Sequence, residues 1–195
     1  MNFISQSIPE VFLIEPVIHK DIRGYFVETF KQALFDEAIG YKVSFVQDNE
    51  SKSISRGVLR GLHFQSYPHT QGKLVRVISG KVLDVAVDIR RNSKTFGQHV
   101  AIDLSEENKK QLFIPRGFAH GFVVLSDSAT ISYKVDAYYS AEHNEGIAFN
   151  DPDLNIKWPS NTPIVSKKDQ RASFFKDILC FVYGRFDEIS LFYIG

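Results

Sequence analysis

The sequence predicts an all-β fold, a sandwich or barrel with a few short helices, and three observations indicate it. Residues 43–138 divide into short apolar runs separated by turn residues, which is typical of antiparallel β-proteins. The 17 phenylalanines and 8 tyrosines favour strands. No helical segments alternate with these strands, as βαβ units would require. The 195 residues suffice for one domain with a sizeable core.

The first forty residues are predicted to contain two strands, a turn and one helix. The strands cover residues 11–18 and 25–30, and Asp-Ile-Arg-Gly at residues 21–24 is a turn signal between them. A helix is predicted over residues 31–39, because its apolar residues can share one face and Gly40 is a suitable stop.

The remaining strands are predicted over residues 43–48, 57–64, 73–78, 81–89, 98–104, 111–114, 121–125 and 130–138. Ser79-Gly80 predicts a two-residue hairpin between two of them. Residues 82–88 are apolar at nearly every position, which indicates a central strand. The C-terminal segment, residues 171–195, is ambiguous: Phe174, Phe175, Ile178 and Phe181 have helical spacing, whereas residues 181–183 fit a strand.

Bulk properties exclude several classes of protein. The formal net charge is zero, which disfavours a protein that binds nucleic acid without regard to sequence. Cys180 is the single cysteine, so we expect a packed thiol and neither an internal disulfide nor a Cys-rich metal site. No basic segment precedes a long apolar run at the N-terminus, and no segment has the roughly 20 apolar residues of a membrane span. We therefore expect a cytoplasmic protein.

A histidine, an arginine and a lysine stand within sequence that is predicted to form strands. His63 alternates with Leu62 and Phe64, so its side chain is expected on the opposite face from theirs. A lone histidine in a strand is typically a hydrogen-bonded core residue. Arg60 and Lys73 favour a polar cavity instead, because three cationic groups are not stable together without an anion. A phosphate or diphosphate fits, since arginine binds phosphate oxygens through two hydrogen bonds.

Other polar residues allow both a structural and a functional interpretation. Arg23 and Glu28 fit a turn and a solvated strand position. Gln47 and Asn49 either end a strand or contact the edge of a base. Tyr133 is either part of the core or, with its hydroxyl in a cavity, a general acid.

Two further side chains need context before a role can be assigned. Residues 114–122, Ile-Pro-Arg-Gly-Phe-Ala-His-Gly-Phe, contain a proline and two glycines and are predicted to form a loop. His120 in this segment is either bonded to the backbone or functional. Asp169 follows two lysines and, considered alone, is typical of an exposed carboxylate in a loop.

Common cofactor and metal motifs are missing from the sequence. It contains no Gly-x-Gly-x-x-Gly, no Walker loop and no Gly-x-Ser-x-Gly. It has no His-x-His pair, and a turn-like Ser-Tyr-Pro lies between His63 and His69. We therefore expect neither a metal nor a cofactor.

A series of segments carries a family resemblance, in order along roughly residues 5–172: Asp-Ile-Arg-Gly-Tyr-Phe-Val-Glu (21–28), Phe-Val-Gln-Asp-Asn-Glu-Ser (45–51), Val-Leu-Arg-Gly-Leu-His-Phe-Gln (58–65), Gln-Gly-Lys-Leu-Val (71–75), Asp-Val-Ala-Val-Asp-Ile-Arg (84–90), Ser-Lys-Thr-Phe-Gly (93–97), the 114–122 segment, Asn-Asp-Pro (150–152) and Ile-Lys-Trp-Pro (156–159). With these segments the sequence resembles the dTDP-4-dehydrorhamnose 3,5-epimerases, the RmlC-like branch of the cupin folds. Residues 177–195 match no motif of that family.

The resemblance implies one jelly-roll domain over residues 1–195, working as a homodimer that exchanges N-terminal strands. It implies His63 as the base, oriented by Asp169, Tyr133 as the acid on the opposite face of the sugar, and Lys73 near the sugar ketone. Phe26 and Tyr138 would stack on the base of the nucleotide. The dTDP-4-keto-6-deoxyhexose substrate would be held by these two rings together with Arg23, Glu28, Gln47, Asp48, Asn49, Arg60, His120, Glu145 and Lys168.

Three alternatives stand beside a 3,5-epimerase. An enzyme that inverts one carbon, or acts on another 4-keto sugar nucleotide, would use the same acid and base. A jelly roll that only binds a sugar nucleotide would not need His63, Asp169 and Tyr133 together. The missing His-x-His disfavours a metal-dependent cupin oxygenase. Gln47 and Asn49 fit more than one base, so these residues leave the nucleotide open.

Overall fold

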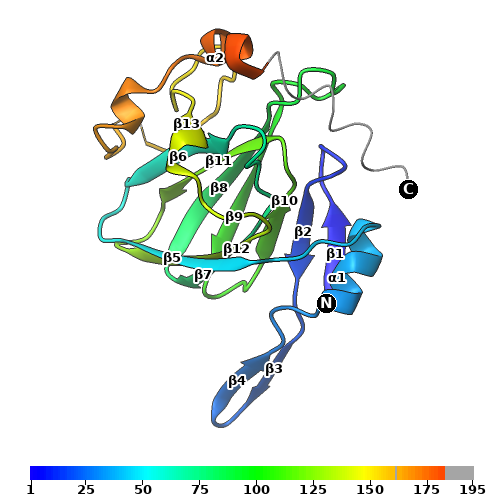
Figure 1. Ribbon diagram of the computed structural model, residues 1–195. Helices are drawn as coiled ribbons and strands as arrows, with labels where there is room; N and C mark the ends of the chain where they lie inside the picture. The colour runs from blue at the N-terminus through cyan, green and yellow to red at the C-terminus, as the bar shows by residue number, and fades with distance from the viewer. Residues whose placement is uncertain (161, 183–195) are drawn as a thin grey trace.

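Two antiparallel sheets, packed face to face, form the body of the protein (Figure 1). The computed structural model describes residues 1–160 and 162–182. The first sheet has the order β1-β2-β10-β7-β12-β5, with bounds Asn2–Ser5, Phe12–Glu15, Gln111–Ile114, Lys73–Ser79, Ala129–Val135 and Gln47–Ser53. The second has the order β13-β6-β11-β8-β9, with bounds Asn144–Gly146, Leu59–Gln65, Phe118–Val124, Lys81–Asp88 and His99–Ser105. This arrangement confirms the predicted all-β jelly-roll sandwich.

The core lies between the sheets, and apolar layers also cover their outer faces. Strand β8 shows why its sequence is apolar throughout: Val82 and Ala86 face the central core, whereas Val85 and Val87 face an outer cluster. The strand lies between β11 and β9, so the prediction of an interior strand is confirmed.

Helices cover the outer faces of the sheets. Helix α1 (Gln32–Ile39) places Phe35 against the first sheet, and Gly40 ends it in the left-handed region at φ 86°, as predicted. Helix α2 (Phe175–Val182) packs Phe175 and Ile178 against the second sheet, so the helical alternative for this segment is confirmed. Short 3₁₀ turns occupy η1 (Ala141–His143) and η2 (Asp169–Arg171). The remaining ambiguous residues, 183–195, lie outside the described part of the chain.

The hairpin predicted at Ser79-Gly80 is wrong. Strand β7 pairs with β10 and β12, whereas β8 pairs with β9 and β11, so the two residues carry the chain from one sheet to the other. Gly80 has φ 80°, and a Cβ built there would overlap the carbonyl oxygen of Ser128. The glycine is needed for a tight crossing between layers, and local sequence does not distinguish this from a hairpin turn.

Several strand boundaries also differ from the prediction. The predicted strand over residues 43–48 is wrong for its first half: Val43 and Phe45 pack beneath α1 without strand pairing, and β5 begins at Gln47. The predicted strand over residues 11–18 is two strands, β2 and β3 (Ile18–Asp21), and β1 was missed. Strand β11 begins at Phe118, so part of the predicted loop over residues 114–122 is a strand.

The hairpin of β3 and β4 (Gly24–Val27) projects from the sandwich (Figure 1). The turn predicted at residues 21–24 is confirmed, and the Asp21 carboxylate accepts hydrogen bonds from the backbone N–H and the guanidinium of Arg23 at 2.8 and 2.6 Å. The hairpin pairs with no other strand among the described residues, and Ile22 and Phe26 are 105% and 69% exposed. An isolated two-stranded hairpin is at best marginally stable in water.

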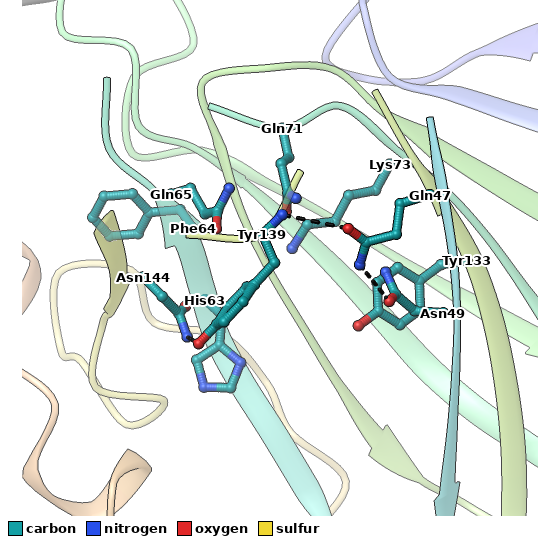
Figure 2. A pocket seen from close by; sticks show the side chains of 10 residues that line it. All are labelled: Gln47, Asn49, His63, Phe64, Gln65, Gln71, Lys73, Tyr133, Tyr139 and Asn144. Carbon is teal, nitrogen blue, oxygen red and sulfur yellow. Dashed lines mark hydrogen bonds between the residues drawn. The ribbon is translucent and has the colours of Figure 1, made fainter. Parts of the chain in front are cut away.

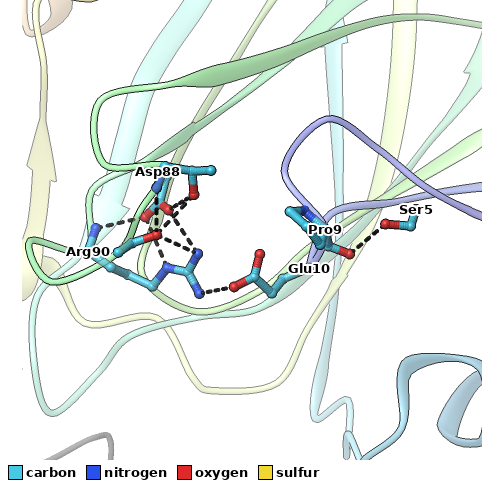
Figure 3. Close-up of polar contacts among 7 residues, drawn as sticks. Ser5, Pro9, Glu10, Asp88 and Arg90 are labelled. Atoms are coloured by element: carbon cyan, nitrogen blue, oxygen red, sulfur yellow. Dashed lines mark hydrogen bonds and ion pairs between the residues drawn. The ribbon is translucent and has the colours of Figure 1, made fainter.

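A buried ion pair lies at the end of β8 (Figure 3). Asp88, fully buried at the end of β8, accepts hydrogen bonds from Arg90 Nε and Nη2 at 2.9 and 2.8 Å and from the Thr95 hydroxyl at 2.6 Å. Arg90 Nη1 also contacts Glu10 at 3.0 Å, which joins β8 to the N-terminal turn.

Neither helix in the described part of the chain has the length and apolar character to cross a lipid bilayer.

Candidate active site

A β-bulge in β6 directs two polar side chains into one cavity. His63 lies opposite His120 on β11, and Arg60 lies opposite Phe122, so three steps on β6 match two on β11. Regular alternation would place Arg60 and His63 on opposite faces of the strand. With the extra residue, both line the hollow between the sheets while Leu62 packs into the outer cluster.

Glycines permit the close approach of the strands at this bulge. Gly61 has φ 124°, and a Cβ built there would lie 2.5 Å from Gly121 Cα. A Cβ at Gly121 would lie 2.9 Å from the carbonyl oxygen of Arg60. Since real Cβ atoms do not make such contacts, both positions require glycine for the bulge to form.

The cavity has two lobes of about 310 and 600 Å³ that meet between the sheets. The residues shared by both lobes are His63, Lys73, Tyr133, Tyr139 and Asn144. The smaller lobe is completed by Gln47, Asn49, Phe64, Gln65 and Gln71 (Figure 2). The larger lobe is completed by Ser51, Val58, Leu59, Arg60, His120, Phe122, Ile164, Val165, Ser166, Lys168 and Asp169.

His63 and Asp169 form a hydrogen-bonded pair on one wall. His63 Nε2 lies 2.6 Å from Asp169 Oδ1, and Asp169 is only 5% exposed, which corrects its interpretation as an exposed loop residue. Burial raises the pKa of Asp169, but hydrogen bonds from His63, Ser166 and the Gly61 backbone outweigh it, so the pKa lies below its ordinary value. The carboxylate is therefore ionised at neutral pH and accepts the Nε2 proton, which leaves the Nδ1 lone pair as the basic site.

Tyr133 stands on the opposite sheet. It lies on β12 between Asn49 of β5 and Val75 of β7, with its ring partly buried. Burial raises its pKa, and the nearby positive charge of Arg60 only partly opposes this. The phenol therefore stays protonated at neutral pH and can donate a proton from the wall that faces His63.

Lys73 is the first residue of β7 and, by alternation, continues the inward row of Val75 and Val77. Burial lowers its pKa to about 8, and the carboxylate of Asp84 acts against this shift. At neutral pH most Lys73 side chains therefore carry a positive charge at the cavity wall.

The structure brings together nine of the residues expected at the site. The cavity is lined by His63, Lys73, Tyr133, Asp169, Gln47, Asn49, Arg60, His120 and Lys168. His120 is 7% exposed on β11, and its Nε2 contacts the Asp84 carboxylate at 2.9 Å, so it is neither in a loop nor bonded to backbone through this atom.

The other expected site residues do not line this cavity. Alternation along β5 directs Asp48 to the far face, where it binds Lys134 Nζ at 2.9 Å. Glu145 lies on β13, where its backbone is paired with Phe64 of β6, and Tyr138 is 68% exposed to solvent. The remaining three, Arg23, Phe26 and Glu28, lie on or beside the projecting hairpin.

Three residues at the site were not foreseen. Tyr139 and Asn144 stand at the junction of the two lobes, where the Asn144 amide donates to the Tyr139 hydroxyl at 3.0 Å (Figure 2). Asp84 is fully buried beside His120. A signal for Asp84 did exist, since a charged residue alternates with Val82 and Ala86 on the core face of an interior strand.

The chain is similar to known proteins over most of its length. The sequence profile of the family described as dTDP-4-dehydrorhamnose 3,5-epimerase matches residues 5–177. A protein of that name from Shigella flexneri is 53% identical over 182 residues, covering 93% of this chain and 100% of the relative. The crystal structure of dTDP-6-deoxy-D-glucose-3,5-epimerase RmlC from Legionella pneumophila, in complex with dTDP-4-keto-L-rhamnose, is 49% identical with a TM-score of 0.89, covering 93% and 96% of the two chains. The structure of ChmJ, a 3'-monoepimerase from Streptomyces bikiniensis in complex with dTDP-quinovose, is 33% identical with a TM-score of 0.84, covering 90% and 89%.

Proposed function

Because the chain belongs to the dTDP-4-dehydrorhamnose 3,5-epimerase family, we propose that His63 and Tyr133 transfer the protons of that reaction across the cavity between the sheets. The chain is a carbohydrate epimerase that converts dTDP-4-dehydro-6-deoxy-D-glucose to dTDP-4-dehydro-L-rhamnose. The observation that carries the assignment of residues is the placement of the His63–Asp169 pair and Tyr133 on facing sheets around one cavity.

Proton removal is assigned to His63. The ketone at C4 acidifies the hydrogens on C3 and C5, and the Nδ1 lone pair of His63 takes one of them to form an enolate. Asp169 fixes the tautomer through Nε2 and stabilises the imidazolium that results, as the carboxylate of a catalytic triad does. An imidazole suits this step because its pKa lies near neutral pH.

Enolate stabilisation is assigned to Lys73. The negative charge that develops on the C4 oxygen needs a donor or cation, and the Lys73 ammonium group lines both lobes of the cavity. Electrostatic stabilisation by one well-placed donor is worth about 3 kcal/mol in a site sheltered from water.

Return of the proton from the other face is assigned to Tyr133. A proton delivered by the phenol to the face opposite His63 inverts the carbon. The tyrosinate is then reprotonated from solvent, and the His63 imidazolium releases the abstracted proton to solvent. The oxidation state of the sugar is the same before and after, so the chemistry requires no nicotinamide.

Arg60 and Lys168 are assigned to the diphosphate. Both line the larger lobe, together with His120 and Ser166, and bring positive charge to a wall that otherwise includes Leu59, Phe122 and Ile164. Gln47 and Asn49 line the smaller lobe, and the Gln47 amide donates to Asn49 Oδ1 at 2.7 Å. These groups would hold the nucleotide sugar so that its ring lies between His63 and Tyr133.

One incubation tests the function and the number of carbons inverted. The protein is mixed with dTDP-4-keto-6-deoxyglucose in D₂O, and product stereochemistry and deuterium content are read by NMR. We expect inversion and deuterium incorporation at both C3 and C5. Inversion at C3 alone would identify a monoepimerase, the activity of the neighbour ChmJ. Binding without deuterium incorporation would identify a protein that only binds the sugar nucleotide.

We also propose a homodimer in which the β3–β4 hairpin of each subunit completes the site of its partner. The exposed apolar residues of the hairpin support this, because a second copy would cover Ile22 and Phe26. The arrangement would bring Arg23, Phe26 and Glu28 to a cavity, where the family resemblance expects them.

Mixed dimers test this exchange. Subunits with His63→Ala are combined with subunits that carry Arg23→Ala and Phe26→Ala, using two affinity tags to isolate the mixed species. If hairpins serve the partner's cavity, one of the two sites in each mixed dimer is intact, and the isolated mixed species recovers about half of wild-type activity. Each variant alone is the control. Recovery no greater than the sum of the controls would show that each hairpin serves its own subunit.

A further inference from the structure

Asp84 is a fully buried carboxylate that none of the steps above uses. It lies on the core face of β8 between Val82 and Ala86, where an ionised group is costly unless it has a partner. Its position in an otherwise apolar row indicates that it does something that an aliphatic residue could not.

His120 is the first partner of this carboxylate. His120 Nε2 lies 3.0 and 2.9 Å from the two oxygens of Asp84, and both side chains are almost entirely buried. With Nε2 held by the carboxylate, Nδ1 is the other polar atom of an imidazole that lines the larger lobe. Asp84 therefore fixes both the orientation and the tautomer of His120.

Lys73 is the second group that the charge of Asp84 affects. Burial disfavours its charged form, and the negative charge of Asp84 is what opposes that effect. The other charged or titratable side chains that line this cavity are Arg60 and His63 of β6, His120 of β11, Tyr133 of β12, Tyr139, Lys168 and Asp169. Arg60 and Lys168 repel an ammonium group, so the negative charge that favours the protonated form of Lys73 is that of Asp84, which also binds His120.

We propose that Asp84 is a positioning residue of the epimerase site: its buried carboxylate orients His120 at the cavity wall and supplies negative charge beside the lobe that Lys73 and His120 both line. The inference rests on the proposed function, because the charge on Lys73 matters through the enolate that it stabilises. Asp84 itself touches no substrate atom in this scheme and acts through its two neighbours.

Asp84→Asn removes the charge while keeping an amide oxygen that can accept from His120. The matched control is Asp88→Asn, since Asp88 is an equally buried carboxylate on the same strand, whose partners are Arg90 and Thr95 outside the cavity. Both variants are compared at a temperature at which circular dichroism shows them folded.

The pH profile of kcat/KM is the main readout. Wild type is expected to lose activity as pH rises through about 8, where Lys73 loses its proton. In Asp84→Asn the midpoint of this high-pH decline in kcat/KM, the basic limb of the profile, should move down by about one pH unit. The kcat/KM at pH 8.5 should then fall about tenfold relative to wild type, and at pH 6.5 it should change by less than about threefold. Asp88→Asn should keep the wild-type limb. An unshifted limb in Asp84→Asn, or an equal shift in Asp88→Asn, would overturn the proposal while leaving the epimerase function intact.

Two measurements need no turnover and therefore separate this inference from the proposed function. Competitive labelling with acetic anhydride, read on the Lys73 peptide by mass spectrometry, should give a midpoint near 8 in wild type and a lower one in Asp84→Asn. Side-chain ¹⁵N NMR of wild type should show His120 protonated at Nε2. A Lys73 midpoint near that of an ordinary lysine, or a His120 tautomer protonated only at Nδ1, would contradict the role of Asp84 even if Asp84→Asn did not fold.

Discussion

His63→Ala is expected to reduce kcat by about 10⁴-fold, because it removes the group that takes the proton from C3 and C5. Deuterium exchange from solvent at both carbons should disappear. Binding of the dTDP-sugar should change little, since the diphosphate and nucleotide are assigned to Arg60, Lys168, Gln47 and Asn49 on other parts of the cavity.

Single-turnover NMR in D₂O measures the exchange, and calorimetry measures the binding. His99→Ala is the control, because His99 is a partly buried histidine on β9 that does not line the cavity. Exchange that persists at the wild-type rate in His63→Ala would remove His63 from the role of base. Loss of both exchange and binding would point to a collapsed cavity, which the far-ultraviolet and near-ultraviolet spectra would reveal.

Tyr133→Phe is expected to slow formation of the fully inverted sugar by about 10²–10³-fold while leaving proton abstraction less affected. The substitution keeps the ring that packs against the core and removes only the hydroxyl. The expected signature is therefore washout of hydrogen from C3 or C5 that outpaces inversion, since His63 can still remove a proton and return one to the same face.

Comparing the two rates in one NMR time course makes the test specific for the acid. Tyr41→Phe is the control, because it removes a phenolic hydroxyl from the aromatic cluster beneath α1. If Tyr133→Phe produced the 3,5-inverted sugar at the normal rate, the assignment of Tyr133 as the acid would be wrong.

Local pattern predicted much of the fold because alternation is a local property. The inward direction of His63 follows from Leu62 and Phe64 on either side of it, and the interior position of β8 follows from its apolar residues on both faces. The crossing at Ser79-Gly80 could not be predicted in this way, because a tight turn with glycine looks the same whether the next strand pairs with the last one or enters the other sheet.

The residues of the candidate site also divide into those that local sequence predicts and those that it does not. Asp169 lies 106 residues from His63, so only the family resemblance, and not spacing, connected them before the structure. Tyr138 and Tyr139 are adjacent, and their sequence gives no basis for choosing which ring lines the cavity; the structure favours Tyr139. Asp84 could have been found from its strand alone, because a carboxylate in an apolar row of an interior strand is costly without a function or a partner.

The bulge in β6 has a consequence for the size of molecule that can react. Arg60 and His63 project from one strand at a spacing set by the backbone itself. The strand therefore fixes the distance between the group assigned to the diphosphate and the group that removes the proton. In the proposed binding mode, a diphosphate bridge spans that distance. A sugar attached through a single phosphate would bring its ring short of the imidazole, so discrimination between such donors would be set by main-chain geometry rather than by any contact with the hexose.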